Sequence, residues 1–316
     1  MAGLARTAAL LALLAAPAAA RTLTVGPGQE FDRPSAAALV ANDGDVLLIE
    51  PGAYYDCVTS RAEGLTIAGR GPGVVLTDTT CGGKAILVLG GGNVTVRDLT
   101  LARARVADGN GAGVRLEAPG ATFERVKFLN NQAGILGGTG RVTITDCTFE
   151  GGGVGGERPT FAVNIGPAEA LDVTGSTFGP TRGGQIRAAA GRVTVRNSTL
   201  DSAIAGPAIE AKGDLVLEGS TLRLFGDAAA GARVSDGTAT LRRNRLVNET
   251  GRSVPLLQHW GAGAPVLDSN TVPPGDSAMS TSGAWRHEAS ELYHGAKDNA
   301  RRAAGAAKRT LREWLQ

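Results

Sequence analysis

Residues 133–149 read AGILGGTGRVTITDCTF, and this stretch contains the two patterns that determine the fold. The first is a pair of small residues followed by an aliphatic one, Ala133-Gly134-Ile135. The second is an alternating segment that ends in a large apolar residue, Val142 to Phe149. Alternation with a period of two and one apolar face is typical of a half-buried β-strand. One unit therefore holds at least two short strands joined by a glycine-rich turn.

Both patterns recur along the chain. Copies of the first end at Ile86, Val114, Ile135, Val163, Ile186, Ile209, Ala232 and Leu257, at separations of 21 to 28 positions and about 24 on average. Copies of the second begin at Val94, Val142, Leu171, Val193, Leu215, Ala239 and Pro265. Self-similarity at such a period is typical of a solenoid, so one repetitive unit is predicted for residues 46–275.

The absence of helical segments between the strands excludes a βαβ arrangement. An antiparallel sandwich would not keep the same residue types in register over eight units. A parallel coil does, because each residue stacks on its equivalent one turn later, and every coil buries its apolar edge against its neighbours. The sequence therefore predicts an all-β parallel solenoid of about ten coils with an aliphatic ladder: Ile86, Val114, Ile135, Val163, Ile186 and Ile209.

Composition agrees with a regular stack. Glycine accounts for 46 of 316 residues and aromatic residues for 4%, whereas compact cores draw much of their buried area from large aromatic side chains. The formal net charge is +2, so nothing indicates a nucleic-acid partner.

The first twenty residues have the features of a secretory signal peptide. Arg6 precedes an apolar segment at 8–16, and Ala18-Ala19-Ala20 offers a small-residue cleavage site before Arg21. No later segment is apolar enough to span a membrane, so we expect a soluble protein that is secreted or periplasmic.

Cysteine positions fit an oxidising compartment. Cys57 and Cys81 lie 24 residues apart, about one coil, and stacked strands are about 4.8 Å apart. That spacing is within the range a disulfide accepts, so a bridge is predicted; the alternative is two separate small core residues. Cys147 takes a turn position that later coils fill with Ser or Asn, which indicates a structural turn ladder: Ser176, Ser198, Ser220, Asn244 and Asn270.

The beginning of the repeat resembles a known family. A short helix is expected over Phe31 to Ala41, with Ser35 near its start and Leu39-Val40 on its apolar side, as a cap on the first coil. The chain continues with Gly44-Asp45 and Pro51-Gly52-Ala53-Tyr54. Together with 110–114 (NGAGV) and 130–135 (NNQAGI), these segments resemble the pectate-lyase-like right-handed β-helix superfamily over roughly residues 22 to 275. The resemblance implies a single-stranded right-handed parallel β-helix, in a superfamily that includes lyases, hydrolases, epimerases and non-enzymes.

The predicted organisation has four parts. Residues 1–20 are the signal peptide, 21–45 an N-terminal strand and cap helix, 46–275 the β-helix, and 276–316 a linker and a C-terminal helix. In that last helix, apolar residues from Leu292 to Trp314 recur at helical spacing among basic ones. It could pack back onto the solenoid, lie on an anionic membrane surface, or bind a partner.

The residue after each ladder position should point outward. These residues are Leu87, Arg115, Leu136, Asn164, Arg187, Glu210, Arg233 and Gln258. A second outward set follows two positions later: Leu89, Glu117, Gly138, Gly166, Ala189, Lys212, Ser235 and Trp260. Small residues precede the ladder, so the first set describes a shallow polar trough whose repeat of about 4.8 Å is close to the scale of a sugar residue.

The trough suggests binding of an acidic polysaccharide, with Arg115, Asn164, Arg187, Glu210 and Arg233 as contacts, because the guanidinium fork suits carboxylates. Lyases of the resembled superfamily often use Lys or Arg on this face as the base, with calcium or another cation as neutraliser. That resemblance implies Arg187 or Lys212 as the base and Arg233 or Arg115 as the neutraliser.

Hydrolysis is less favoured, since it needs carboxylates close together and Glu117 and Glu210 are three to four coils apart. No aspartate cluster supports a calcium site, so no cofactor is predicted.

A plain solvated surface would also be polar, so three functions remain open. They are a uronate lyase or epimerase, a non-catalytic carbohydrate-binding or cell-envelope protein, and a scaffold that binds a protein partner through its tail.

Overall fold

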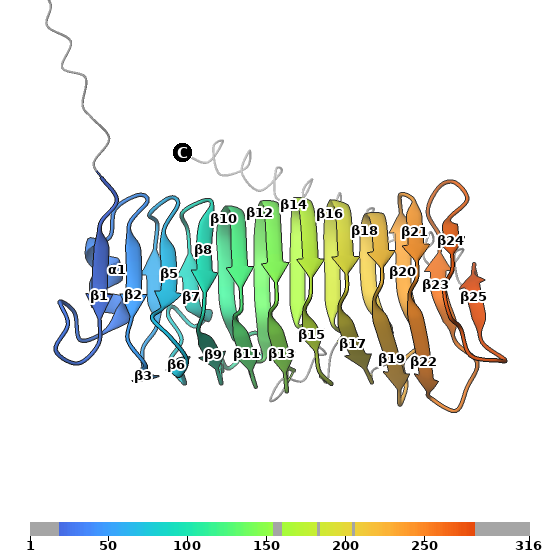
Figure 1. Cartoon of the computed structure of the whole chain (residues 1–316), viewed down its shortest axis with the longest axis horizontal. Helices are drawn as coiled ribbons and strands as arrows, with labels where there is room; N and C mark the ends of the chain where they lie inside the picture. The colour runs from blue at the N-terminus through green and yellow to red at the C-terminus, as the bar shows by residue number, and fades with distance from the viewer. Residues whose placement is uncertain (1–18, 154–159, 182–183, 204–205, 282–316) are drawn as a thin grey trace, which may run out of the picture.

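The computed structural model describes residues 19–153, 160–181, 184–203 and 206–281. These residues form a parallel β-solenoid of about 11 turns, against about ten predicted, and successive coils lie side by side along one axis (Figure 1). Most of the predicted signal peptide and of the C-terminal helix lies outside the described residues, so both remain predictions.

Two parallel sheets make up the coils. The larger has 16 strands. They are β1 (Thr22–Val25), β2 (Val46–Ile49), β4 (Val58–Ser60), β5 (Thr66–Gly69), β7 (Ala85–Leu89), β8 (Val94–Arg97), β10 (Ala112–Glu124), β12 (Ala133–Thr145), β14 (Val163–Thr174), β16 (Ile186–Arg196), β18 (Pro207–Glu218), β20 (Ala230–Asp236), β21 (Ala239–Arg242), β23 (Pro255–His259), β24 (Val266–Asp268) and β25 (Ser277–Ser280). β25 pairs with β23, so the sheet continues past residue 275.

The smaller sheet has nine strands. They are β3 (Gly52–Tyr54), β6 (Val74–Thr77), β9 (Thr100–Ala102), β11 (Lys127–Leu129), β13 (Thr148–Glu150), β15 (Thr177–Phe178), β17 (Thr199–Ser202), β19 (Thr221–Phe225) and β22 (Arg245–Glu249). A middle coil such as β10 with β11 thus presents three strand segments. β10 is interrupted by a register shift near Pro119, and a tight turn at Arg125 leads into β11.

The aliphatic ladder has the predicted register from Val114 onward. Successive strands pair Val114 with Ile135, Ile135 with Val163, Val163 with Ile186, and Ile186 with Ile209, and all five side chains are buried. Parallel pairing and the placement of Ile135 and Ile186 in one file confirm the solenoid.

The prediction was wrong by one residue in the coil that contains β7. Val114 pairs with Leu87, and Ala112 pairs with Ala85, so Leu87 occupies the ladder position that was assigned to Ile86. Leu87 was expected to point outward but is fully buried. The triplet pattern misled because both Ile86 and Leu87 are aliphatic, whereas the next three coils have a small residue at the position of Ile86: Gly113, Gly134 and Ala162.

That small residue is required by the opposite sheet. Phe128, Phe149 and Phe178 form a stack with ring centroids 4.5 and 4.6 Å apart. A Cβ on Gly113 would lie 2.7 Å from the Phe128 ring, and one on Gly134 would lie 2.7 Å from the Phe149 ring. Because these glycines have no side chain, they leave room for the phenylalanine rings of the opposite sheet, and the two sheets can pack closely.

A second ladder runs through the turn after the second strand segment. The backbone N–H of Cys147 donates to Ser176 Oγ (3.1 Å), and the N–H of Ser176 donates to Ser198 Oγ (3.1 Å). The pattern continues through Ser220 and Asn244 to Asn270. These bonds satisfy buried turn amides, which confirms the predicted structural role of the Cys147 position.

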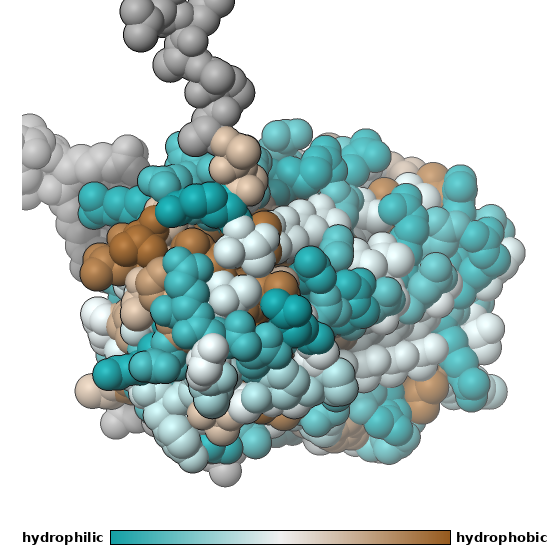
Figure 2. Space-filling model, turned by 60° about the vertical axis from the view of Figure 1, so that its left-hand side comes forward, coloured by the Kyte–Doolittle hydropathy of each residue, from teal (hydrophilic) through white to brown (hydrophobic). Residues whose placement is uncertain are grey.

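Helix α1 (Pro34–Val40) lies at the β1 end of the solenoid (Figure 1). It is shorter than predicted, and it buries Pro34, Ala37 and Ala38. Leu39 and Val40 were expected on the buried side but are 86% and 46% exposed. Figure 2 shows hydrophobic surface at this end of the molecule. In the part of the chain that the structure describes, no helix is long and apolar enough to cross a membrane.

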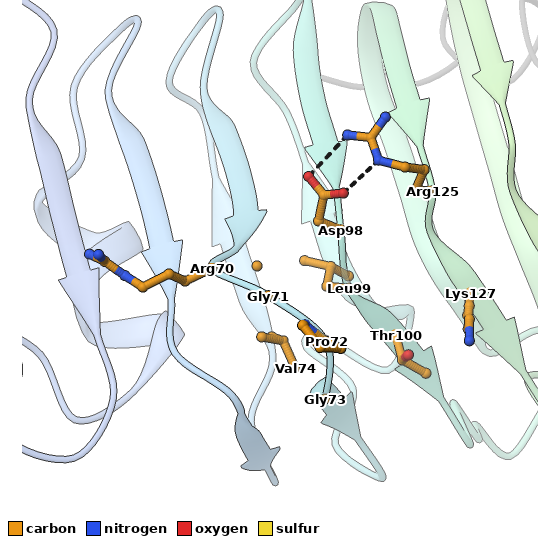
Figure 3. A pocket seen from close by; sticks show the side chains of 11 residues that line it. Arg70, Gly71, Pro72, Gly73, Val74, Asp98, Leu99, Thr100, Arg125 and Lys127 are labelled. Carbon is orange, nitrogen blue, oxygen red and sulfur yellow. Dashed lines mark hydrogen bonds and ion pairs between the residues drawn. The ribbon is translucent and has the colours of Figure 1, made fainter.

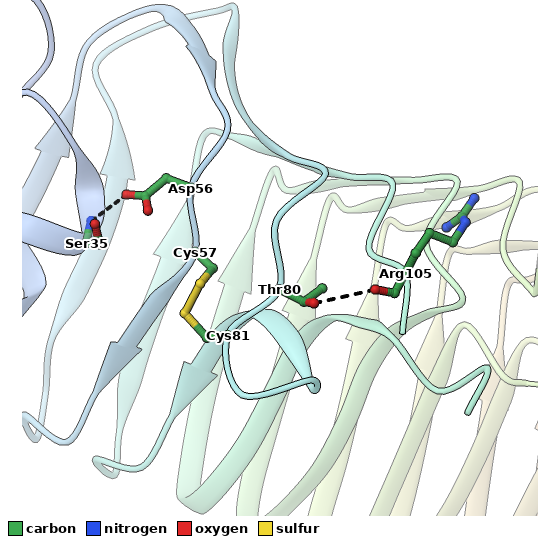
Figure 4. The surroundings of a disulfide bond; sticks show 6 residues. All are labelled: Ser35, Asp56, Cys57, Thr80, Cys81 and Arg105. Carbon is green, nitrogen blue, oxygen red and sulfur yellow. Dashed lines mark hydrogen bonds between the residues drawn. A yellow bond between two sulfur atoms is a disulfide. The ribbon is translucent and has the colours of Figure 1, made fainter. Parts of the chain in front are cut away.

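A disulfide joins Cys57 to Cys81, with a Cα–Cα distance of 5.5 Å (Figure 4). Next to it, Asp56 Oδ2 accepts a hydrogen bond of 2.8 Å from the backbone N–H of Ser35 in the first turn of α1. The bridge therefore holds the segment that anchors the helix, and it links that segment to the loop before β7.

Asp45 anchors the first strand. Its buried carboxylate accepts hydrogen bonds from the backbone N–H of Arg21 (2.8 Å) and from the Arg21 guanidinium (2.7 Å at Nη2). It also accepts one from the backbone N–H of Asn42 (2.9 Å). The bond from Arg21 is the main reason that the pKa of Asp45 falls to about 2.

We expect Asp45→Asn to lower the free energy of unfolding at neutral pH by about 2 kcal/mol, because charge-assisted hydrogen bonds are lost. The folded-state pKa of Asp45 lies below the ordinary aspartate value of 3.8, so this contribution is present above that value. The difference between variant and wild type should shrink as the pH falls toward the folded pKa. Urea unfolding at several pH values measures it. Asp32→Asn, an exposed position with the same charge change, is the control; an equal loss there would contradict the assignment.

The Cys147 thiol should be unreactive in the folded protein. It is 1% exposed, and burial raises its pKa to about 12, so almost no nucleophilic thiolate is present at neutral pH. Treatment with a thiol-specific reagent should modify one cysteine only after unfolding in denaturant, with the disulfide intact. Rapid modification of the native protein would show that this turn opens.

Candidate functional site

The polar side chains of the trough lie in one file across successive coils. The backbone register pairs Asn164 with Arg187, Arg187 with Glu210, Glu210 with Arg233, and Arg233 with Gln258. We call these five residues the charged file. Adjacent members are one coil apart, about 4.8 Å at the backbone. The file runs over β14, β16, β18, β20 and β23.

The N-terminal half of the predicted trough is different. Arg115 and Leu136 belong to the same outward file, but Leu136 is only 6% exposed. The residue aligned with Arg115 in β7 is Val88, also 6% exposed. These two aliphatic side chains form a small apolar cluster with Ala85, Ala112 and Ala133, outside the main core. The polar surface suited to a ligand therefore begins at Asn164.

Two members of the second outward set are not exposed as predicted. Leu89 and Ser235 were expected to face solvent, but both are buried. A register shift after Ala211 pairs Lys212 with Asp236, so Asp236 takes the place predicted for Ser235. The Lys212 ammonium lies 3.8 Å from the Asp236 carboxylate. The trough therefore carries an acidic side chain that the regular spacing did not predict.

Arg187 is held between two neighbours. Its Nε and Nη2 both lie 2.9 Å from Glu210 Oε2. Its guanidinium also lies 4.3 Å from the centroid of the Phe161 ring. The Arg187 side chain is half exposed, so the pair contributes little to stability but fixes the direction of the guanidinium.

Arg233 has a different environment. Its Nε donates to Gln258 Oε1 (2.9 Å), and its guanidinium lies 4.6 Å from the centroid of the Trp260 ring. Burial lowers the pKa of Arg233, and the positive charge of Arg187 lowers it further, while the charge of Glu210 raises it. Among the described residues Arg233 has no carboxylate within ion-pair distance. Its charge is therefore partly desolvated and available to an anionic ligand.

The remaining candidates do not join this group. Arg115 lies three coils before Arg187, on β10, and its Nε is buried without a hydrogen-bond partner. Lys84 and Glu117 form an ion pair beside a hollow of about 230 Å³ at the β4 end of the same face. Glu117 lies on β10 and Glu210 on β18, four coils apart, or about 19 Å. That distance is too large for the paired carboxylates of a glycosidase.

The geometry supports anion binding more directly than acid–base chemistry. Arg187 is already bonded to Glu210, and Arg233 is the cation closest to it in the file. Within residues 19–153, 160–181, 184–203 and 206–281, no group of three or more His, Cys, Asp or Glu side chains could hold a metal ion. What the charged file offers is two fixed guanidinium groups and one carboxylate, with the Trp260 ring beside Arg233.

Sequence reasoning missed two of these components. Phe161 begins the triplet that ends at Val163, and the triplet pattern does not predict that its ring lies beside the Arg187 guanidinium. Gln258 was placed in the outward file but not identified as the partner of Arg233. The sequence did contain a signal for Phe161, because it is much larger than the residues at the equivalent positions of other coils. Those positions hold Ala, Gly or Pro: 112, 133, 184, 207, 230 and 255.

Another hollow lies elsewhere, beside the turn at 69–73 (Figure 3). Its volume is about 480 Å³. Between β5 and β6 the chain uses four residues (70–73) where the next coil uses two (98–99), so this turn protrudes beside the tight turn at Asp98. Arg125 closes the hollow but is bonded to Asp98 through Nε (2.6 Å) and Nη2 (3.1 Å). Lys127 lies on the same side, on β11.

The parallel coils and their register place this chain in a class of right-handed solenoids. The family described as right handed beta helix region matches residues 84–272, more than half of the chain, and the chain belongs to that family. No curated protein matches the sequence.

Among solved structures, pectin methylesterase from carrot is similar at 14% identity, with a TM-score of 0.46. The match covers 83% of this chain and 89% of that one. Pectin methylesterase PemA from Erwinia chrysanthemi is similar at 12% identity, with a TM-score of 0.42. That match covers 86% of this chain and 94% of that one.

Proposed function

We propose that this chain binds an acidic polysaccharide along the charged file, and that binding rather than bond cleavage is its main activity. The observation that carries the proposal is the environment of Arg233. Its guanidinium is partly desolvated, oriented by Gln258 and Trp260, and without an acidic partner among the described residues. A carboxylate that reached it would form charge-assisted hydrogen bonds with a preorganised fork.

The surroundings suit an extended sugar polymer. The file is outward-facing and follows the solenoid axis, so a chain molecule could cross several coils without bending. Trp260 adds apolar surface beside the Arg233 guanidinium. Such an aromatic side chain provides contact area for the C–H faces of sugar rings.

We also propose that the protein is secreted or periplasmic. The sequence features of residues 1–20 and the disulfide between Cys57 and Cys81 support this location, because disulfides persist in oxidising compartments.

Arg233→Ala should weaken binding of acidic polysaccharides at least tenfold, since a charge-assisted contact of about 1.5–3 kcal/mol is lost. Affinity electrophoresis and calorimetry with polygalacturonate and hyaluronan at fixed salt measure the change. Arg245→Ala removes the same charge from the smaller sheet and should have little effect. Arg233→Lys, which keeps the charge without the fork, should fall in between. Equal losses for Arg233→Ala and Arg245→Ala would indicate only general electrostatic attraction.

A lyase is the second candidate, and the oriented Arg233 guanidinium favours it, because a fixed cation could neutralise the uronate carboxylate during β-elimination. β-Elimination would leave an unsaturated uronate that absorbs in the ultraviolet. We expect no such rise with either polymer under conditions where binding is saturated. A rise that Arg233→Ala abolishes would establish the lyase instead.

A further inference from the structure

The order of charges in the file has a consequence for the kind of polymer that fits. Along consecutive coils the side chains are neutral, positive, negative, positive and neutral: Asn164, Arg187, Glu210, Arg233 and Gln258. The two arginines are two coils apart, about 10 Å at the backbone, with Glu210 midway between them. A sugar residue in an extended chain advances by roughly one coil.

Glu210 lies between the two arginines of the file. Its Oε2 accepts from Arg187, and its charge also acts on Arg233 from the other side. Its side chain is 29% exposed, so a ligand that follows the file passes over it. A ligand carboxylate above Glu210 would meet a like charge, whereas a hydroxyl or an amide N–H there could donate to it.

We propose that the charged file selects polysaccharides that carry a carboxylate on every second sugar, with a neutral sugar between. Carboxylates two residues apart would reach Arg187 and Arg233 together, and the neutral sugar would lie over Glu210. Polymers of uronate alone would place a carboxylate against Glu210 at each binding register that uses both arginines. This specificity rests on the proposed binding function.

General electrostatics predicts the opposite preference. A homopolymer of uronate has twice the charge density of an alternating polymer of the same length, so a non-specific basic surface would bind it more tightly. A preference for the alternating polymer therefore cannot arise from charge attraction alone.

The test uses the full secreted chain and two sets of size-matched oligosaccharides, from polygalacturonate (a carboxylate on every sugar) and from hyaluronan (a carboxylate on alternate sugars). Calorimetry at fixed salt gives both affinities. We expect wild type to bind the hyaluronan set at least tenfold more tightly. Glu210→Gln should reduce the ratio of the two affinities at least threefold, mainly by strengthening binding of the homopolymer. The ratio is the readout, because freeing Arg187 strengthens binding of both polymers.

Glu249→Gln, which removes a carboxylate from β22 on the smaller sheet, should leave the ratio unchanged, and thermal unfolding checks that both variants are folded. If wild type binds neither set, the proposed binding function fails. If wild type binds both sets and Glu210→Gln leaves their ratio unchanged, binding stands and the alternating specificity is overturned. A wild-type preference for the homopolymer also overturns it.

Discussion

Backbone hydrogen bonding between parallel, in-register strands holds successive coils about 4.8 Å apart and stacks each residue on its equivalent. Each side chain must therefore be compatible with its equivalents in the coils above and below, because all of them lie in the same column. The Phe128, Phe149 and Phe178 stack shows the result, with rings nearly parallel and glycine or alanine opposite them. The polar column from Cys147 to Asn270 obeys the same rule, since each side-chain oxygen accepts from the turn amide of the preceding coil.

Columns of charge are more demanding, because identical charges one coil apart would repel. Where adjacent coils both carry a charge in one column, the sign changes. Arg196 and Glu218 share a column and form an ion pair (3.2 Å). Arg187 and Glu210 follow the same pattern. Arg233 follows Glu210 in the column, and the next residue is the neutral Gln258 rather than a second carboxylate. The last charged member of this column is thus a cation that packing has partly desolvated.

The sequence predicted most of the fold because the repeat itself carries the register. From Val114 to Leu257 the buried ladder positions could be assigned from the triplets alone. The assignment failed at Ile86, where two aliphatic residues adjoin, and at Ser235, where a register shift after Ala211 moves Asp236 into the column. It also failed at Leu39 and Val40, because a short helix can bury alanines and proline against the sheet while its larger side chains face solvent.

The contacts of the candidate site were harder to predict than its positions. Spacing placed Arg187, Glu210 and Arg233 in one column, but it contained no information on which aromatic ring lies beside which guanidinium. Arg187 takes Phe161 from the preceding coil, and Arg233 takes Trp260 from the following one, so the two pairs extend in opposite directions along the axis. Because β16, β18 and β20 are bonded along their length, the spacing between the two guanidinium groups is set by the backbone rather than by flexible loops. A ligand that binds both must match a distance that the core of the solenoid determines.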